Sequence, residues 1–97
     1  MRIVWRNEAC LDLNDIYGYI AEDNPAAVGE VVDTIYSYTN RQLSEHPDSG
    51  RNGRVPGTLE LVMPRYRSYI VVYQRAANRI EILAVIHSRR RWPSSFE

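Results

Sequence analysis

The first half of the chain carries apolar residues at helical spacing. Four of them recur at intervals of four, three and four residues, which is typical of one buried helix face and predicts a helix over 8–22. These positions are Ala9, Leu13, Ile16 and Ile20. The residues Arg2–Trp5 favour a strand, and Asn7 is of a type that caps helix N-termini. A first strand should therefore lead directly into this helix.

A second helical pattern follows after a short connection. Asn24-Pro25 combines an N-cap residue with a proline at the first helical position, and it predicts a helix over 25–45. The apolar positions of this helix are Val28, Val31, Val32, Ile35 and Leu43. Because only two or three residues connect the helices, they should form an antiparallel hairpin with both apolar faces on the same side.

The second half of the chain changes character after residues 46–53, which contain a proline and two glycines. Val, Ile, Tyr and Leu then predict strands over 57–63, 68–75 and 79–88, separated by links of hairpin length. The result is an α+β fold of order β-α-α-β-β-β, in which the N-terminal helix hairpin packs on one face of a mainly antiparallel sheet. No repeat or linker divides the sequence, so we expect a single domain over 1–97.

Alternation along the last of these strands assigns its two faces. Ile80, Ile82, Ala84 and Ile86 share the face that should receive the helices, and Glu81, Leu83, Val85 and His87 share the other. Two helices can cover only one face of a sheet. Leu83 and Val85 should therefore be exposed and form an apolar groove for a partner.

Composition narrows the class of protein. Hydrophobic residues make up 44% of the 97 residues and charged residues 25%, as in a globular domain. The longest apolar runs have five residues, whereas a membrane-spanning helix needs about 20. Acidic residues from Glu8 onward interrupt any signal peptide, and one cysteine with two histidines disfavours both a disulfide framework and a structural zinc site. We expect a cytoplasmic protein without metal, cofactor or membrane contact.

Charge is distributed unevenly, although the formal net charge is zero. Residues 1–50 hold three arginines and nine acids, and residues 51–97 hold nine arginines and three acids, so the halves carry −6 and +6. All twelve cations are arginine, whose planar fork binds phosphate or carboxylate in a bidentate manner. Codon use in a GC-rich genome is an alternative explanation for the missing lysine, but it does not explain the clustering. The basic half predicts an anionic partner, either nucleic acid or an acidic protein surface.

Four stretches, in the predicted order of elements, carry a resemblance to a known family. They are Glu8–Leu13 (EACLDL), Gly53–Val62 (GRVPGTLELV), Tyr69–Tyr73 (YIVVY) and Ile82–Trp92 (ILAVIHSRRRW). Together they resemble the RelE/ParE superfamily of toxins from type II toxin-antitoxin modules. The resemblance covers nearly the whole chain and implies the same α+β fold.

This superfamily has two activities, and the residues favour one of them. RelE-like members cut mRNA in the ribosome, whereas ParE-like members poison DNA gyrase and have no catalytic centre. Where RelE-like members carry an arginine in the YIVVY stretch, this chain has Ile70, and the C-terminal tyrosine of that branch is also missing. An aliphatic side chain cannot stabilise a phosphorane. The resemblance thus implies a ParE-like gyrase inhibitor, with a ribosome-dependent mRNA endonuclease, and hence an enzyme, as the alternative.

The alternative would need a general acid and base. His87, beside the arginines, could act with Arg89 and Arg90 on a phosphate, and Glu60 could serve as base. The structural interpretations are that His87 only forms local hydrogen bonds and that Glu60 forms a salt bridge to Arg54 or to a neighbouring strand.

The binding hypothesis rests mainly on the three consecutive arginines. Only three acids exist in the basic half, so Arg89, Arg90 and Arg91 cannot all be paired and should contact gyrase, nucleic acid or an acidic antitoxin segment. Trp92 should pin the tail to the body, and Arg65 and Arg67 could extend the basic surface or be a solvated turn. The partner implied by the resemblance is a small DNA-binding antitoxin with a flexible C-terminal segment that covers the groove at Leu83 and Val85.

Overall fold

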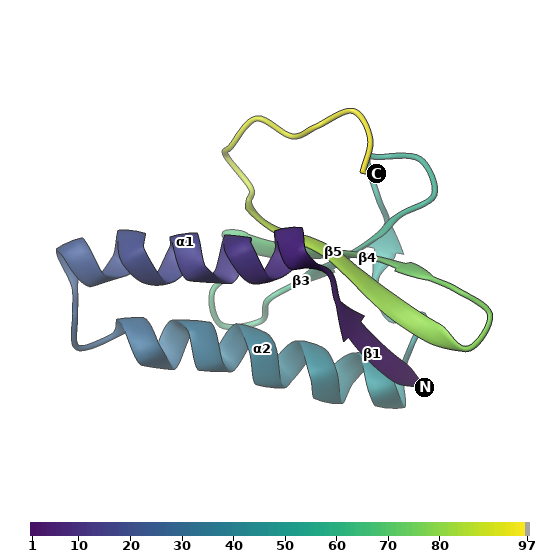
Figure 1. Cartoon of the computed structure of the whole chain (residues 1–97), viewed down its shortest axis with the longest axis horizontal. Coiled ribbons are helices and arrows are strands. Elements are labelled where there is room, and N and C mark those ends of the chain that lie inside the picture. The colour runs from purple at the N-terminus through teal and green to yellow at the C-terminus, as the bar shows by residue number, and fades with distance from the viewer. Residues whose placement is uncertain (97) are drawn as a thin grey trace.

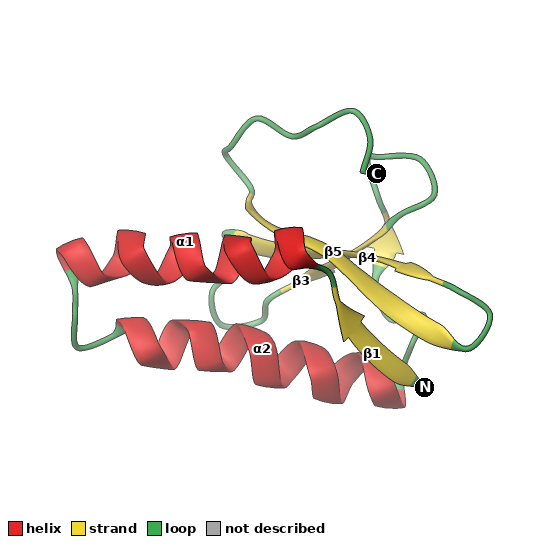
Figure 2. Cartoon of the chain, in the orientation of Figure 1, coloured by secondary structure: helices red, strands yellow, loops and turns green. Residues whose placement is uncertain are grey.

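The computed structural model describes residues 1–96. The elements in chain order are β1 (Arg2–Trp5), α1 (Asn7–Asp23), α2 (Val28–Glu45), β2 (Arg51–Asn52), β3 (Leu59–Val62), β4 (Tyr69–Arg75) and β5 (Arg79–His87). The helices lie side by side and antiparallel against a five-stranded sheet (Figures 1 and 2). The predicted α+β architecture is confirmed.

Both helices begin at a different residue from the one predicted. The prediction that Asn7 caps α1 is wrong, because the capping position is Arg6, whose backbone N–H donates to the Ile82 carbonyl at 3.0 Å and prolongs β1 up to the helix. α2 begins at Val28, since the Ala27 N–H donates to the Asn24 carbonyl at 3.0 Å and closes a turn around Pro25. The helix hairpin itself is confirmed.

The sheet has the strand order β1-β5-β4-β3-β2. β1 is parallel to β5, and the other pairs are antiparallel. The sequence did not predict β2, which has two residues and pairs Arg51 with Glu60 in the segment that was assigned to a turn. β5 is therefore an interior strand between the first and the fourth.

A β-bulge in β5 overturns part of the predicted face assignment. Val72 pairs with Ala84 while Tyr73 pairs with Ile82, so Leu83 is an extra residue without a partner on β4. One inserted residue inverts the alternation that follows it. Val85 therefore lies in the core beneath the helices, where Ala84 was expected, and Ala84 lies on the opposite face with Leu83.

The prediction that Leu83 and Val85 are exposed is wrong, because both side chains are buried, with exposures of 3% and 5%, although both still line a hollow beside the C-terminal tail. The C-terminal tail, residues 88–96, lies over the face of the sheet that the helices leave open (Figures 1 and 2). Trp92 and Phe96 of the tail pack on a small cluster formed by Val72, Leu83 and Ala84. The sheet thus has a cover on each face.

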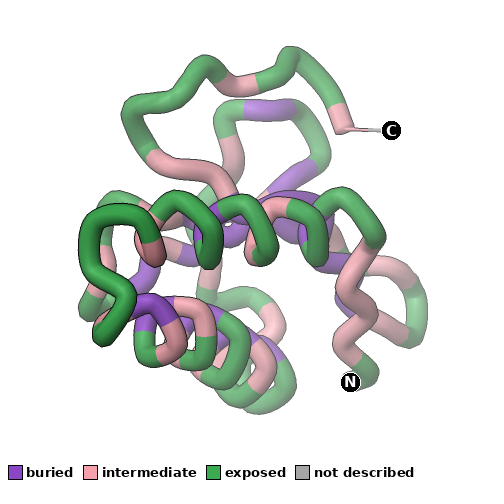
Figure 3. Tube along the Cα trace, turned by 60° about the vertical axis from the view of Figure 1, so that its left-hand side comes forward, coloured by how far each residue is buried: buried purple, intermediate pink, exposed green. Residues whose placement is uncertain are grey.

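The two helices are buried to different extents. α2 contributes five buried residues and α1 only Ala9 and Ile16. Figure 3 shows the same difference, since exposed segments dominate α1 and buried ones recur along α2. α1 therefore presents most of its length to solvent beside the end of β5.

Candidate functional site

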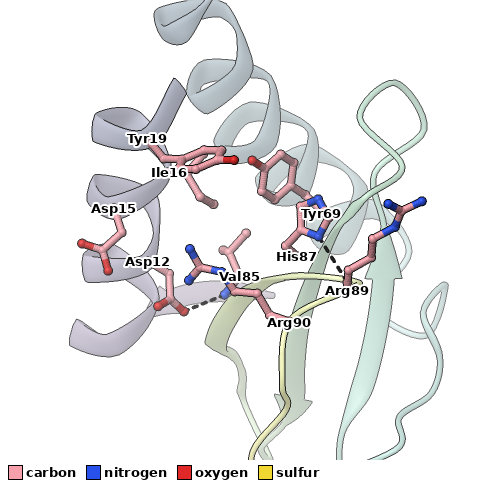
Figure 4. A pocket seen from close by; sticks show the side chains of 9 residues that line it. All are labelled: Asp12, Asp15, Ile16, Tyr19, Tyr69, Val85, His87, Arg89 and Arg90. Carbon is pink, nitrogen blue, oxygen red and sulfur yellow. Dashed lines mark hydrogen bonds between the residues drawn. The ribbon is translucent and has the colours of Figure 1, made fainter. Parts of the chain in front are cut away.

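A groove runs between α1 and the end of β5 (Figure 4). It contains a cavity of about 310 Å³. The lining residues are Asp12, Asp15, Ile16, Tyr19, Tyr69, Val85, His87, Arg89 and Arg90. A second hollow adjoins it at Asp12, Val85 and Arg90, and continues between α1 and the tail as far as Phe96. One wall of the groove is thus acidic and the other basic, with an apolar floor.

Asp12 accepts a backbone hydrogen bond from β5 beyond the point where β1 ends. β1 pairs with β5 only up to Ile82, and the next outward donor, the Val85 N–H, is bound by the Asp12 carboxylate at 2.9 Å. Burial raises the pKa of Asp12, and the neighbouring Asp15 adds to this, while the Val85 N–H and Arg90 oppose it without cancelling it. Sequence reasoning missed Asp12, because its partner is set by the bulge, which no periodicity indicates.

His87 is half-buried at the end of β5. Its Nδ1 accepts a hydrogen bond from the Arg89 backbone N–H at 3.1 Å, and its ring packs at nearly a right angle to that of Tyr69, with centroids 5.4 Å apart. These contacts fit the structural interpretation of His87 as a residue that orders the turn.

Glu60 lies on the other face of the sheet from His87. Its side chain is 2% exposed and accepts hydrogen bonds from Arg51, at 3.1 Å, and from the backbone and side chain of Arg54, at 2.8 and 3.2 Å. Burial alone would raise the pKa of Glu60, but these donors outweigh it and hold the pKa below its usual value. The salt bridge to Arg54 is as predicted, and Glu60 does not join the His87 cavity.

Arg54 contacts both Glu60 and the C-terminal tail. Its guanidinium stacks on the Trp92 ring at 3.6 Å from the centroid, a cation–π contact. Trp92 is therefore an anchor of the tail rather than a free contact residue.

The arginine candidates separate into two groups. Arg65 forms an exposed ion pair with Glu30 on α2 at 2.7 Å. Arg67, Arg89, Arg90 and Arg91 are exposed and form no ion pair within residues 1–96. Arg90 reaches toward Asp12, whereas Arg89 points away from the cavity (Figure 4). The Ser88 N–H donates to the Ser68 carbonyl at 2.7 Å and holds the two turns together.

No group of three or more His, Cys, Asp or Glu side chains within residues 1–96 is placed to hold a metal ion. Neither helix there has the length and apolarity that crossing a membrane requires.

Comparisons with known proteins found a matching family model, a similar protein and a similar solved structure. A family model described as the ParE toxin of the type II toxin-antitoxin system parDE matches residues 3–92. The chain is 40% identical over 92 residues to "Putative toxin Y4kP" of Sinorhizobium fredii, covering 95% of this chain and 93% of that protein. It also resembles a solved structure of the chromosomal ParDE toxin-antitoxin system from P. aeruginosa, with a TM-score of 0.82 at 23% identity, over 90% of this chain and 95% of that one.

Proposed function

The chain belongs to the ParE toxin family of type II toxin-antitoxin systems, and from this premise we propose that it arrests growth by binding and inhibiting DNA gyrase until a cognate antitoxin neutralises it. The single observation that carries the proposal beyond the family is the set of exposed arginines at Arg67 and Arg89–Arg91, which form no ion pair within residues 1–96. Unneutralised guanidinium groups favour contact with an anionic partner.

The separation of the nuclease candidates supports binding over catalysis. Glu60 and His87 lie on opposite faces of the sheet, and Glu60 is already saturated by Arg51 and Arg54. Ile70, at the position of the missing arginine, is 3% exposed. General acid–base chemistry needs its groups within hydrogen-bond reach of one substrate.

The groove supports an antitoxin segment as the second partner. Its acidic wall on α1 and its basic wall at Arg89–Arg91 suit a segment with basic side chains on one side and acidic ones on the other. Such a segment, flexible when free, would fold as it binds and offset its ordering cost by burying the apolar floor.

One observation favours the alternative of a ribosome-dependent mRNA endonuclease. His87 lines the same cavity as Arg90, so an imidazole and a guanidinium group could reach one phosphate.

A supercoiling assay tests the proposal. Purified toxin, gyrase, ATP and relaxed plasmid are incubated with and without the antitoxin's C-terminal segment. We expect supercoiling to be lost or cleaved plasmid to accumulate, and the segment to reverse either effect. Arg90→Ala should weaken the effect in part, and Arg2→Ala, an exposed arginine at the other end of the sheet, should not.

The opposite outcome of the supercoiling assay would contradict the proposal. If gyrase is unaffected while the toxin still arrests growth, the gyrase proposal is wrong. Cleavage of mRNA on purified ribosomes that Arg90→Ala abolishes would then establish the nuclease alternative.

A further inference from the structure

One end of the sheet carries positive charge that the surrounding structure does not neutralise. Arg67 in the turn before β4 and Arg89 and Arg91 after β5 are exposed, without ion pairs inside residues 1–96. We call these three residues the basic end. Arg90 is set apart, because it reaches into the groove toward Asp12.

The lack of nearby acids is a property of the sequence itself. Residues 61–80 and 82–96 contain no Asp or Glu. The two acids of the described strands, Glu60 and Glu81, are each bound by two arginines away from the basic end. Within residues 1–96, no carboxylate forms an ion pair with the basic end.

The shape of the basic end suits an extended line of phosphates. The Ser88–Ser68 backbone hydrogen bond of 2.7 Å places Arg67 and Arg89 next to each other across two turns. Ser68 and Ser88 are exposed and small, so a polyanion can approach the backbone and meet hydroxyl donors between the guanidinium groups. Arg89 points out of the cavity rather than toward a single focus in it (Figure 4).

We propose that the basic end binds the phosphate backbone of duplex DNA without sequence preference. A single strand would need exposed rings for base stacking beside these arginines, but Tyr69 is packed against His87, and Tyr66 is half-buried beside Arg65. The exposed ring of Tyr19 belongs to α1, on the acidic wall of the groove. The binding goes beyond gyrase inhibition and does not depend on it. In a complex with a DNA-bound enzyme, it would let the toxin contact the enzyme and its DNA together.

The acidic helices do not prevent this binding. The nine acids of residues 1–50 lie mostly on the helices. Asp12 and Asp15 line the groove with Arg89 and Arg90, where Arg90 faces Asp12, but Arg67 and Arg91 do not line that cavity. Exposed charges farther apart than the Debye length, about 10 Å at 0.1 M salt, are largely screened.

Fluorescence anisotropy of a labelled 20-base-pair duplex of about 10⁻⁸ M, titrated with purified toxin over a series of salt concentrations, tests the proposal. Since gyrase is not present, the outcome is independent of the gyrase proposal. We expect micromolar affinity at low salt, on the order of non-specific DNA binding, and a decline in affinity as salt rises. Arg89→Ala/Arg91→Ala should weaken binding and reduce the slope of log affinity against log salt by about two.

A matched double variant removes the same charge elsewhere. Arg2 and Arg41 are also exposed and without ion pairs inside the described residues, and Arg2 lies at the opposite end of β5 by strand register. Arg2→Ala/Arg41→Ala should leave the slope unchanged.

Three outcomes would overturn the proposal. The first is no salt-dependent binding at low salt, and the second is an equal loss in the two double variants. The third is displacement of the duplex by polyglutamate or by single-stranded RNA at lower concentration than by unlabelled duplex, which would indicate an acidic protein or RNA as the partner. Circular dichroism of both variants excludes loss of folding as the cause.

Discussion

The two ends of β5 use the same residue type in opposite ways. At its start, Glu81 accepts hydrogen bonds from Arg6 at 2.6 Å, Arg79 at 2.8 Å and Gln74 at 2.8 Å. After its end, Arg89–Arg91 follow one another without an ion pair inside residues 1–96. An arginine is structural here where the fold brings a carboxylate to it, and remains available for a partner where it does not.

The largest effect on stability is expected at Glu60 of β3, a buried carboxylate that, like Glu81, is paired with two arginines. Glu60→Gln keeps the volume but removes the charge that Arg51 and Arg54 share. Because both arginines are about half-exposed, the free energy of unfolding should fall by about 2 kcal/mol rather than more. Urea denaturation measures it, with exposed Glu22→Gln as the control. Equal midpoints for the two variants would contradict a structural role for the Glu60 cluster.

A somewhat smaller effect is expected at Trp92, which directly follows Arg89–Arg91 and contacts Arg54 of the Glu60 ion pairs. Trp92→Ala removes the ring that packs on the Leu83 cluster and stacks under Arg54, and it should cost about 1–2 kcal/mol because the ring is only partly buried. Trp92→Phe keeps an aromatic ring, so its free energy of unfolding should fall by about half as much as that of Trp92→Ala. If thermal melting shows Trp92→Ala to be as stable as the parent, the tail is not a fixed cover of the sheet.

The neutralised start of β5 should also be visible in the pH dependence of stability. The side chains of Gln74, Arg6 and Arg79 lower the pKa of Glu81 from 4.5 to about 2. A carboxylate with a lowered pKa stabilises the folded state above its unfolded pKa, and this contribution is lost as pH falls through the window from 4.5 to about 2. Glu81→Gln should flatten the stability profile in that window. An unchanged profile in urea titrations at each pH would contradict the assignment.

The smallest effect on stability is expected where the arginines are unpaired. Arg89→Ala/Arg91→Ala should change the free energy of unfolding by less than about 0.5 kcal/mol, since exposed side chains without partners contribute little. The same variant should relieve growth arrest when it is expressed without antitoxin. A large loss of stability would mean that these arginines belong with the structural group.

The pattern of residues along the chain predicted those features that depend on neighbouring residues. The helix hairpin and the meander followed from periodicity and turn residues, and the ion pair of Glu60 with Arg54 followed from its position on the strand. The burial of Leu83 and Val85 did not follow from the local pattern. The bulge depends on how β4 and β5 pair, and the position of the tail depends on a sheet face that exists only after folding. Asp12 was missed for the same reason, since its partner is a backbone N–H exposed by that bulge.

The parallel pairing of β1 with β5 also sets a time at which the protein can become active. Arg2 lies beside Arg79, and Trp5 beside Ile82, so the N-terminal strand must wait through most of translation for its neighbour to be synthesised. Contacts between such distant residues carry a high loop-closure cost and form late. A ribosome making this chain therefore carries an incomplete sheet until β5 has been synthesised, so an antitoxin already present meets a toxin whose sheet closes only late in its synthesis.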